Sequence, residues 1–363
     1  GNGPLHIPSL PNIEGINDFG GEIFHSSNWN HKYDLNDKNV CVIGTGASSI
    51  QFVPEIQPKV KNLYLMQRTA PWVLPKPDGP FSTRQNVMFE KIPFVQRMNR
   101  EFIYYLNEAQ LVGMKYEKRI LKLGEMLGKY HINKYIKDEA LRKKLTPNFS
   151  LGCKRVLLSN NYYPALAQNN VDVVTDGIKK FTKTSVLTND GKSRKIDAII
   201  LGTGFHVADS FKFYNVKGKN GAALKDVLGD SPEAYYGTSI HQFPNLFLML
   251  GPNTGLGHNS MIYMIESQVN YIVDALHQMV RHNIKSIEVR KEVQDAFNVE
   301  IQKKLEGTIW LSGCKSWYLN EDGKNHTVWP GFTLEFRNQT KHIHLKDYII
   351  EKERVVATEF EIA

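Results

Sequence analysis

The stretch Asn39 to Ser49 constrains the fold most strongly, because it has the pattern of an apolar strand, a glycine-rich turn and a helix start. A run such as Val40 to Ile43 is typical of a buried parallel strand. Gly44 permits a tight turn, and Gly46 lets the backbone approach a pyrophosphate at the helix N-terminus. We predict a dinucleotide-binding turn, with a purely structural glycine turn as the alternative. The residues expected to hold the nucleotide are Gly44, Thr45, Gly46, Ala47, Ser48 and Ser49.

The end of the next expected strand indicates which dinucleotide binds. Asn62 to Met66 is a second strand-like run, and Gln67, Arg68 and Thr69 follow it. An NAD site favours an acidic residue here for the ribose hydroxyls, whereas an arginine suits a 2′-phosphate. We therefore predict an NADP site that includes Arg68 and Thr69. The alternative is a solvated surface arginine.

Length and composition are those of a globular protein. The 363 residues are enough for two domains, and 41% of them are hydrophobic and 23% charged. No apolar run approaches the roughly 20 residues of a membrane span, and the first residues do not form a signal peptide. These features favour the cytoplasm. Cys41, Cys153 and Cys314 are widely spaced without a metal or redox motif, so we expect buried free thiols.

The net charge of +8 is concentrated in one region. Between Arg84 and Lys144 there are fourteen Lys and Arg against seven Asp and Glu. A nucleic-acid surface is one interpretation, but no nucleic-acid motif accompanies these residues. A solvated helical face is favoured, and attraction of an anionic cofactor comes second.

Upstream of the first strand lies Phe19-x-Gly21-x-x-x-His25-x-x-x-Trp29, which physical reasoning treats as a linker pinned by its two aromatic side chains. Followed by the strand and the glycine turn, this pattern resembles the fingerprint of type I Baeyer-Villiger monooxygenases, within the flavin-containing monooxygenase group. That family usually has Pro or Asp after the tryptophan, where this chain has Asn30.

The Lys154-Arg155 pair precedes an apolar triplet, and one interpretation is a surface pair beside a strand. The resemblance implies more specific roles. Lys154 would contact the NADP 2′-phosphate, and Arg155 would lie beside the flavin as the catalytic residue. An always charged guanidinium suits that role, because it stabilises negative charge that develops on oxygen.

Two later segments match the flavin part of the family. Residues 195 to 204 form an expected strand ending in Gly-Thr-Gly, which resembles the crossover motif of two-nucleotide flavoproteins and places Thr203 and Gly204 at a cofactor. An apolar strand is expected at 245 to 250, followed by a glycine-rich turn in which Asn253 is a cofactor contact.

A helix is then expected to begin after Ser260, which would cap it and line the flavin site. His258 in this turn is either a base or a hydrogen-bonding histidine. In the aromatic loop that follows, the resemblance implies that Trp317 folds over the nicotinamide.

The order of these motifs predicts an α/β fold with two dinucleotide-binding (Rossmann-like) domains, one carrying a helical insertion. The N-terminal half of the FAD domain is expected to be missing from this chain. Within the insertion, an apolar face of Met98, Phe102, Tyr105 and Leu106 recurs at helical spacing. The expected segments are 1–38, the end of the FAD domain and a linker; 39–79 and 147–205, the NADPH domain; 80–146, the helical insertion; and 206–363, the rest of the FAD domain.

The resemblance implies an enzyme that uses NADPH to reduce FAD, and reduced FAD with O2 to convert a ketone into an ester or lactone. The alternatives are an N- or S-oxygenating flavin monooxygenase and a non-catalytic nucleotide-binding fragment. A reductase of the disulfide class is disfavoured, because no closely spaced cysteine pair exists.

Overall fold

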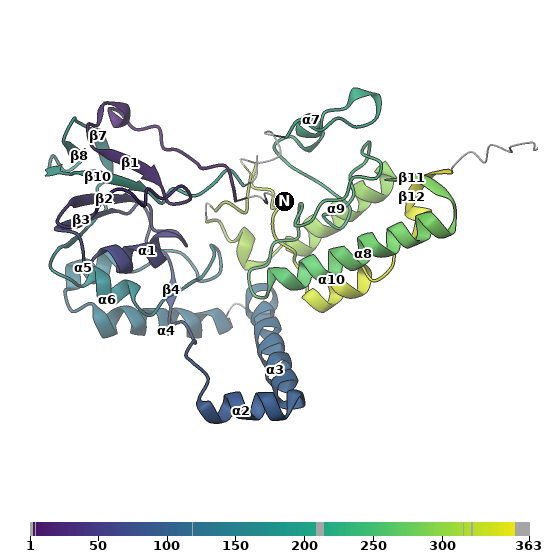
Figure 1. The fold of residues 1–363 in the computed structure, drawn as a ribbon, viewed down its shortest axis with the longest axis horizontal. Helices are drawn as coiled ribbons and strands as arrows, with labels where there is room; N and C mark the ends of the chain where they lie inside the picture. The colour runs from purple at the N-terminus through teal and green to yellow at the C-terminus, as the bar shows by residue number, and fades with distance from the viewer. Residues whose placement is uncertain are drawn as a thin grey trace, which may run out of the picture. The chain divides into compact units, whose positions relative to one another are not determined.

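A computed structural model describes residues 3, 5–117, 119–207, 214–314, 316–320 and 322–352. The chain divides into two compact units (Figure 1). Unit 1 comprises Gly1–Met98, Glu117–Val207 and Ser312–Cys314, and unit 2 comprises Asn99–Tyr116, Ala208–Leu311 and Lys315–Ala363. Within the described ranges, none of the helices has the length and apolar character that crossing a membrane requires.

A five-stranded parallel sheet forms the centre of unit 1, in the order β1-β10-β2-β3-β6. The strands are β1 (Glu22–His25), β2 (Asn39–Ile43), β3 (Asn62–Met66), β6 (Val171–Val174) and β10 (Ala198–Leu201). The strands expected around residues 40 and 62 are confirmed. The interpretation of residues 19–29 as a linker is wrong for Glu22–His25, because these residues pair with β10 as the edge strand.

Alternating side chains of the sheet enter two hydrophobic cores. Val40 and Val42 pack against α1 (Ser49–Ile56) and α6 (Tyr162–Leu166), whereas Cys41 faces a second cluster that includes Phe181. Figure 1 shows α1 and α6 on one side of the sheet and strands β7 and β8 on the other. The remaining strands of unit 1 are β4 (Val73–Leu74), β5 (Leu157–Leu158), β7 (Ile178–Phe181), β8 (Ser185–Thr188) and β9 (Ser193–Lys195).

The strand expected over residues 195–204 is shorter than predicted. Only Ala198–Leu201 belongs to the parallel sheet, while Lys195 ends β9 in an antiparallel three-stranded sheet. Residues 202–204 instead form a loop after β10, in which Gly204 has φ 81°.

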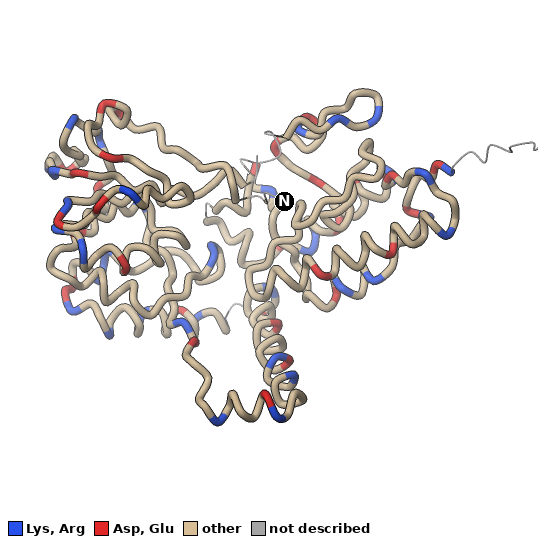
Figure 2. The backbone as a smooth tube through the Cα atoms, in the orientation of Figure 1, with Lys and Arg blue, Asp and Glu red and all other residues tan. Residues whose placement is uncertain are grey.

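The region 80–146 is helical, as predicted. It contains α2 (Thr83–Lys91), α3 (Pro93–Leu111), a π-helical segment (Val112–Tyr116), α4 (Arg119–Tyr135) and α5 (Glu139–Leu145). Of its described Lys and Arg side chains, all are exposed except Lys115 and Arg142, which are half-buried. Figure 2 shows both charge signs distributed along these helices, which favours the solvated helical face.

The apolar face predicted for α3 is not a packing face in the structure. Met98, Phe102, Tyr105 and Leu106 are 54% to 66% exposed. The buried side of α3 near its C-terminal end instead contains Glu108, which is only 6% exposed. The buried residues of α3 are Glu108 and Leu111, so the buried side is only partly apolar, and apolar periodicity selects the wrong face.

Unit 2 is mainly helical. Its helices include α7 (Leu224–Leu228), α8 (Met261–Arg281), α9 (Lys291–Leu305) and α10 (Thr333–Gln339), and β11 (Ile284–Val289) pairs antiparallel with β12 (Tyr348–Lys352). Short 3-10 helices occur at Ile16–Asp18 in unit 1 and at Lys219–Gly221, Ile309–Leu311 and Leu345–Asp347 in unit 2. The helix expected after Ser260 is confirmed.

The strand expected at residues 245–250 is wrong. Asn245 and Leu250 have φ values of 59° and 55°, and the segment forms only an isolated bridge between Phe247 and Ser239. Positive φ at both ends is incompatible with a regular strand. A second parallel dinucleotide sheet is not formed by the described residues of unit 2, so the second nucleotide domain stays a prediction.

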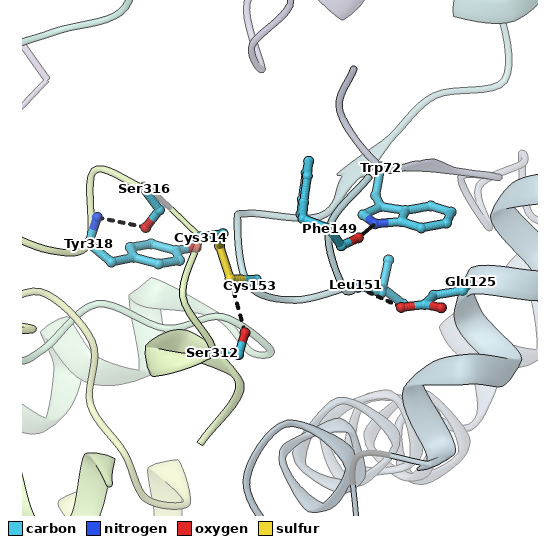
Figure 3. Close-up of a disulfide and its surroundings, with 9 residues drawn as sticks. All are labelled: Trp72, Glu125, Phe149, Leu151, Cys153, Ser312, Cys314, Ser316 and Tyr318. Atoms are coloured by element: carbon cyan, nitrogen blue, oxygen red, sulfur yellow. Dashed lines mark hydrogen bonds between the residues drawn. A yellow bond between two sulfur atoms is a disulfide. The ribbon is translucent and has the colours of Figure 1, made fainter. Parts of the chain in front are cut away.

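The cysteine prediction is also corrected. Cys153 and Cys314 form a disulfide, and both residues belong to unit 1 (Figure 3). Cys41 is a buried free thiol as expected, and burial raises its pKa to about 12. Sequence reasoning missed the disulfide because the two cysteines are 161 positions apart.

Candidate functional site

The carboxyl ends of β2 and β10 meet where the strand order of the sheet reverses. From β2 the chain proceeds to β3 and β6 on one side, whereas β10 and β1 lie on the other side. Ligands of open α/β sheets bind at such a reversal, outside the carboxyl ends of the strands. The turn Gly44–Ser49 follows β2, and residues 202–204 follow β10, so two predicted segments come together here.

Glycines keep the two turns in close approach. Gly44 has φ 106°, and a Cβ added to it would overlap the carbonyl oxygen of Gly202. A Cβ on Gly202 would in turn overlap Oγ of Ser49, a fully buried side chain at the start of α1. Sequence reasoning did not identify Gly202 as a site residue. Its position directly after the crossover strand could have indicated it.

Gly46 differs, because an added Cβ would find no heavy atom within 4 Å. Its exposed backbone lies just before α1, and its carbonyl oxygen accepts a hydrogen bond from the N–H of Ile50 at 3.1 Å. Thr45 donates a hydrogen bond from Oγ1 to the carbonyl oxygen of Thr69 at 3.2 Å, which links the turn to the end of β3. Open space beside a helix N-terminus fits a pyrophosphate.

Two positively charged side chains, those of Arg68 and Lys154, lie near enough to interact electrostatically. Arg68 is exposed after β3, and Lys154 is half-buried with Nζ 4.8 Å from the ring centroid of Phe149. Burial lowers the pKa of Lys154, and the positive charge of Arg68 lowers it further. An anion bound between them would relieve this repulsion. The predicted pair is thus brought together in a way that fits a 2′-phosphate.

His25 of the fingerprint is attached to the crossover turn. Its Nε2 lies 3.1 Å from the carbonyl oxygen of Gly204, and its Nδ1 lies 2.7 Å from Oγ of Ser27. Burial lowers the pKa of His25, partly offset by the bond to Gly204. Thr203 donates from Oγ1 to the carbonyl oxygen of Ser9 at 2.5 Å. His25 thus holds Gly204 in place, and Ser9 holds Thr203.

The remaining predicted cofactor residues belong to unit 2. Ser260 caps α8, since its Oγ accepts a hydrogen bond from the backbone N–H of Ile262 at 3.3 Å. Asn253 is buried, and its Nδ2 donates to the carbonyl oxygens of Asn325 and Val328 at 3.0 and 3.1 Å. Contact of the Asn253 side chain with a flavin would therefore need its Oδ1.

His258 lies buried beside the Glu108 carboxylate. Its side chain is 0% exposed, with Nε2 3.4 Å from Oε1 of Glu108. Asn259 donates to the same carboxylate at 2.6 Å, and Thr333 donates through both N–H and Oγ1 at 3.0 and 2.8 Å. Burial alone would raise the pKa of Glu108, but these bonds and His258 hold it below 4.5. The geometry favours a structural role for His258.

Two predicted residues are solvent-accessible. Arg155 is exposed on the same segment as Lys154 in unit 1, and Trp317 is 46% exposed in unit 2. The structure thus brings the predicted NADP contacts Gly44–Ser49, Arg68 and Thr69 to the carboxyl edge of the sheet. The contacts expected of Arg155, Asn253, Ser260 and Trp317 with FAD or the nicotinamide stay predictions.

Comparison with known proteins then decides the family. Residues 2–221 match the family model described as flavin-binding monooxygenase-like. The chain belongs to this family. A Baeyer-Villiger monooxygenase of Pseudomonas aeruginosa is 48% identical over 350 residues, and the match covers 96% of this chain and 66% of that protein. One from Streptomyces coelicolor is 42% identical, with 95% and 67% covered.

The resemblance to Baeyer-Villiger monooxygenases is therefore confirmed for this family member, which spans about two thirds of the length of these relatives. Among solved structures, cyclohexanone monooxygenase from Rhodococcus sp. Phi1 bound to NADP+ matches with a TM-score of 0.84 at 23% identity. That match covers 97% of this chain and 74% of the other. OTEMO in complex with FAD and NADP matches with a TM-score of 0.83 at 23% identity, covering 96% and 75%. At this identity the structural matches show the fold alone.

Proposed function

We propose that this chain is the NADP-binding and substrate-facing part of an FAD- and NADPH-dependent monooxygenase of the Baeyer-Villiger type. The complete enzyme would insert one oxygen atom of O2 into a ketone to give an ester or lactone. The observation that carries the proposal is the electrostatic interaction of Arg68 with Lys154, which accompanies the open space at the Gly46 backbone. The two relatives named above as Baeyer-Villiger monooxygenases support the reaction type.

Each group at the sheet edge has a distinct task in this proposal. The turn 44–49 would hold the pyrophosphate through backbone N–H groups, and Arg68 with Lys154 would neutralise the 2′-phosphate. Thr69 would border the ribose, because it is linked to Thr45. FAD, when bound, would supply the activation of O2.

Arg155 is the proposed catalytic residue. Its guanidinium offers a planar set of N–H donors for an oxygen anion, and it follows Lys154 directly in the chain. A fixed positive charge beside the flavin would stabilise negative charge developing on the ketone oxygen. Thr203, Gly204, Asn253, Ser260 and Trp317 are proposed cofactor contacts.

Calorimetric titration with NADP and with NAD tests the nucleotide site. A charge-assisted hydrogen bond contributes about 1.5–3 kcal/mol, so Arg68→Ala or Lys154→Ala should weaken NADP binding about 10- to 100-fold. Affinity for NAD should hardly change, because NAD lacks the 2′-phosphate. Arg84→Ala, an exposed arginine on α2, is the matched control and should leave both affinities unchanged. Equal losses for NAD and NADP would refute the assignment of the pair to the 2′-phosphate.

Activity is tested on a longer protein that also contains the part of the sequence that aligns with the rest of its relatives. Ketone and sulfide substrates are compared in the native protein and in Arg155→Ala and Arg155→Lys. Loss of ketone oxygenation in both variants, with NADP binding retained, is the expected result. Undiminished ketone oxygenation by Arg155→Ala would remove the catalytic assignment.

A further inference from the structure

Cys153, which forms a disulfide with Cys314, directly precedes Lys154 and Arg155 in the chain. Its Cα atoms are 6.3 Å apart, and it joins the Lys154-Arg155 segment to Ser312–Cys314 (Figure 3). The bond therefore connects a proposed binding segment to a part of the chain that is remote in sequence.

The segment before the cations is anchored at a few points. Phe149 accepts a hydrogen bond on its carbonyl oxygen from Nε1 of Trp72 at 2.7 Å, and the N–H of Leu151 donates to Oε1 of Glu125 at 3.0 Å. Figure 3 shows these anchors on one side of the segment and the disulfide on the other. The disulfide is the covalent restraint nearest to Lys154, so breaking it would leave the lysine on a less restrained segment.

The two sulfur atoms differ in accessibility. Cys153 is 1% exposed, whereas Cys314 is half-buried and follows the exposed residues Ser312 and Gly313. A thiol reagent would thus reach Sγ of Cys314 and release the sulfur of Cys153 as a thiolate. Oγ of Ser312 lies 3.2 Å from Sγ of Cys153 and donates a hydrogen bond to it. That donor would stabilise the departing thiolate.

We propose that Cys153 and Cys314 form a reversible thiol–disulfide modification site that controls NADP affinity by ordering the segment carrying Lys154. The inference rests on the proposed NADP site. A dithiol reduces the bond: its two sulfurs form a new disulfide, and two electrons and two protons pass to Cys153 and Cys314. Hydrogen peroxide reverses the change, taking the same electrons and protons to give two water molecules. In the cytoplasm expected from the sequence, disulfides are usually of this transient, redox-sensing kind.

The test compares the native chain before and after treatment with dithiothreitol. Thiols are counted in denaturant, NADP binding is titrated, and tryptic cleavage after Lys154 and Arg155 is followed by mass spectrometry. One thiol should titrate in the oxidised protein and three in the reduced protein. In the reduced protein, NADP binding would have to order about one additional backbone residue. The entropy lost in ordering it corresponds to roughly tenfold weaker NADP binding. Cleavage at the two sites should accelerate, and hydrogen peroxide should restore the first state.

Variants separate the disulfide from general effects of reduction. Cys314→Ser should bind NADP like the reduced protein and lose its response to dithiothreitol. Cys41→Ala, which leaves the disulfide in place, should keep that response. The proposal is overturned by three thiols in the peroxide-treated protein, or by equal NADP affinity and equal cleavage in both states. If NADP binds in neither state, the proposed nucleotide site is wrong, and the disulfide cannot regulate NADP affinity. In that case cleavage rates still decide whether the disulfide restrains the segment.

Discussion

Substituting alanine for Gly44 and for Gly46 should separate folding from nucleotide binding. At Gly44 the backbone has φ 106°, and the new Cβ would overlap the carbonyl oxygen of Gly202. A strained backbone conformation of this kind costs about 1–3 kcal/mol, and relieving the overlap requires a further shift of the turn. We therefore expect Gly44→Ala to lower the free energy of unfolding by about 3 kcal/mol.

At Gly46 the new methyl group would enter open space, since nothing lies within 4 Å, and φ is not positive. The free energy of unfolding should change by less than about 0.5 kcal/mol. The methyl group would, however, occupy the position through which a pyrophosphate approaches the backbone. Losing one charge-assisted hydrogen bond of about 1.5–3 kcal/mol should weaken NADP binding by at least about tenfold.

Thermal unfolding and NADP titration measure the two effects. Taking about 2–4 °C per kcal/mol for a domain of this size, Gly44→Ala should lower the midpoint by about 6–12 °C and Gly46→Ala by less than about 2 °C. A large loss of stability in Gly46→Ala would contradict the open space at this turn. Unchanged NADP affinity in a folded Gly46→Ala protein would contradict the position assigned to the pyrophosphate.

Three other predictions concern stability. Ser260→Ala removes the cap of α8 and should cost about 1 kcal/mol in denaturant unfolding; no change would show that the cap is not formed. Glu108→Gln should cost about 2 kcal/mol, because the carboxylate accepts both bonds from Thr333. Because the pKa of Glu108 is lowered, the contribution of its carboxylate to the free energy of unfolding should be complete above pH 4.5 and be lost as the pH falls through the lowered pKa. Glu108→Gln should lack this pH dependence of stability. The pKa of His25 is lowered from 6.5, so the native protein should lose stability as the pH falls below 6.5, and His25→Gln should lose less.

Sequence reasoning succeeded where local chemistry decides the structure. The turn 44–49 can be predicted because only glycine permits its close approaches. The Ser260 cap can be predicted because it depends on one side chain and the helix start next to it. Arg68 was predicted from its place after the second strand, whereas the role of Lys154 came from the family resemblance. The two residues are far apart in the chain, and no local pattern connects them.

The failures share a different cause. The buried side of α3 was misassigned because Glu108 is satisfied by partners more than 150 positions away. The strand at 245–250 failed because apolar composition does not reveal positive φ at Asn245 and Leu250. The disulfide depends on the folded position of two isolated cysteines. In each case tertiary contacts, which leave no periodic signal, decided the outcome.

The position of β10 within the sheet also limits the order in which unit 1 assembles. β10 lies between β1 and β2 but is synthesised after the entire helical region. Closing a loop on the order of 150 residues is slow compared with local hairpin or helix formation. Until Ala198–Leu201 emerges from the ribosome, β1 and β2 lack the strand that joins them, and their apolar edges remain available to other chains. Recombinant yield of this protein should therefore depend on how well those edges are protected during translation.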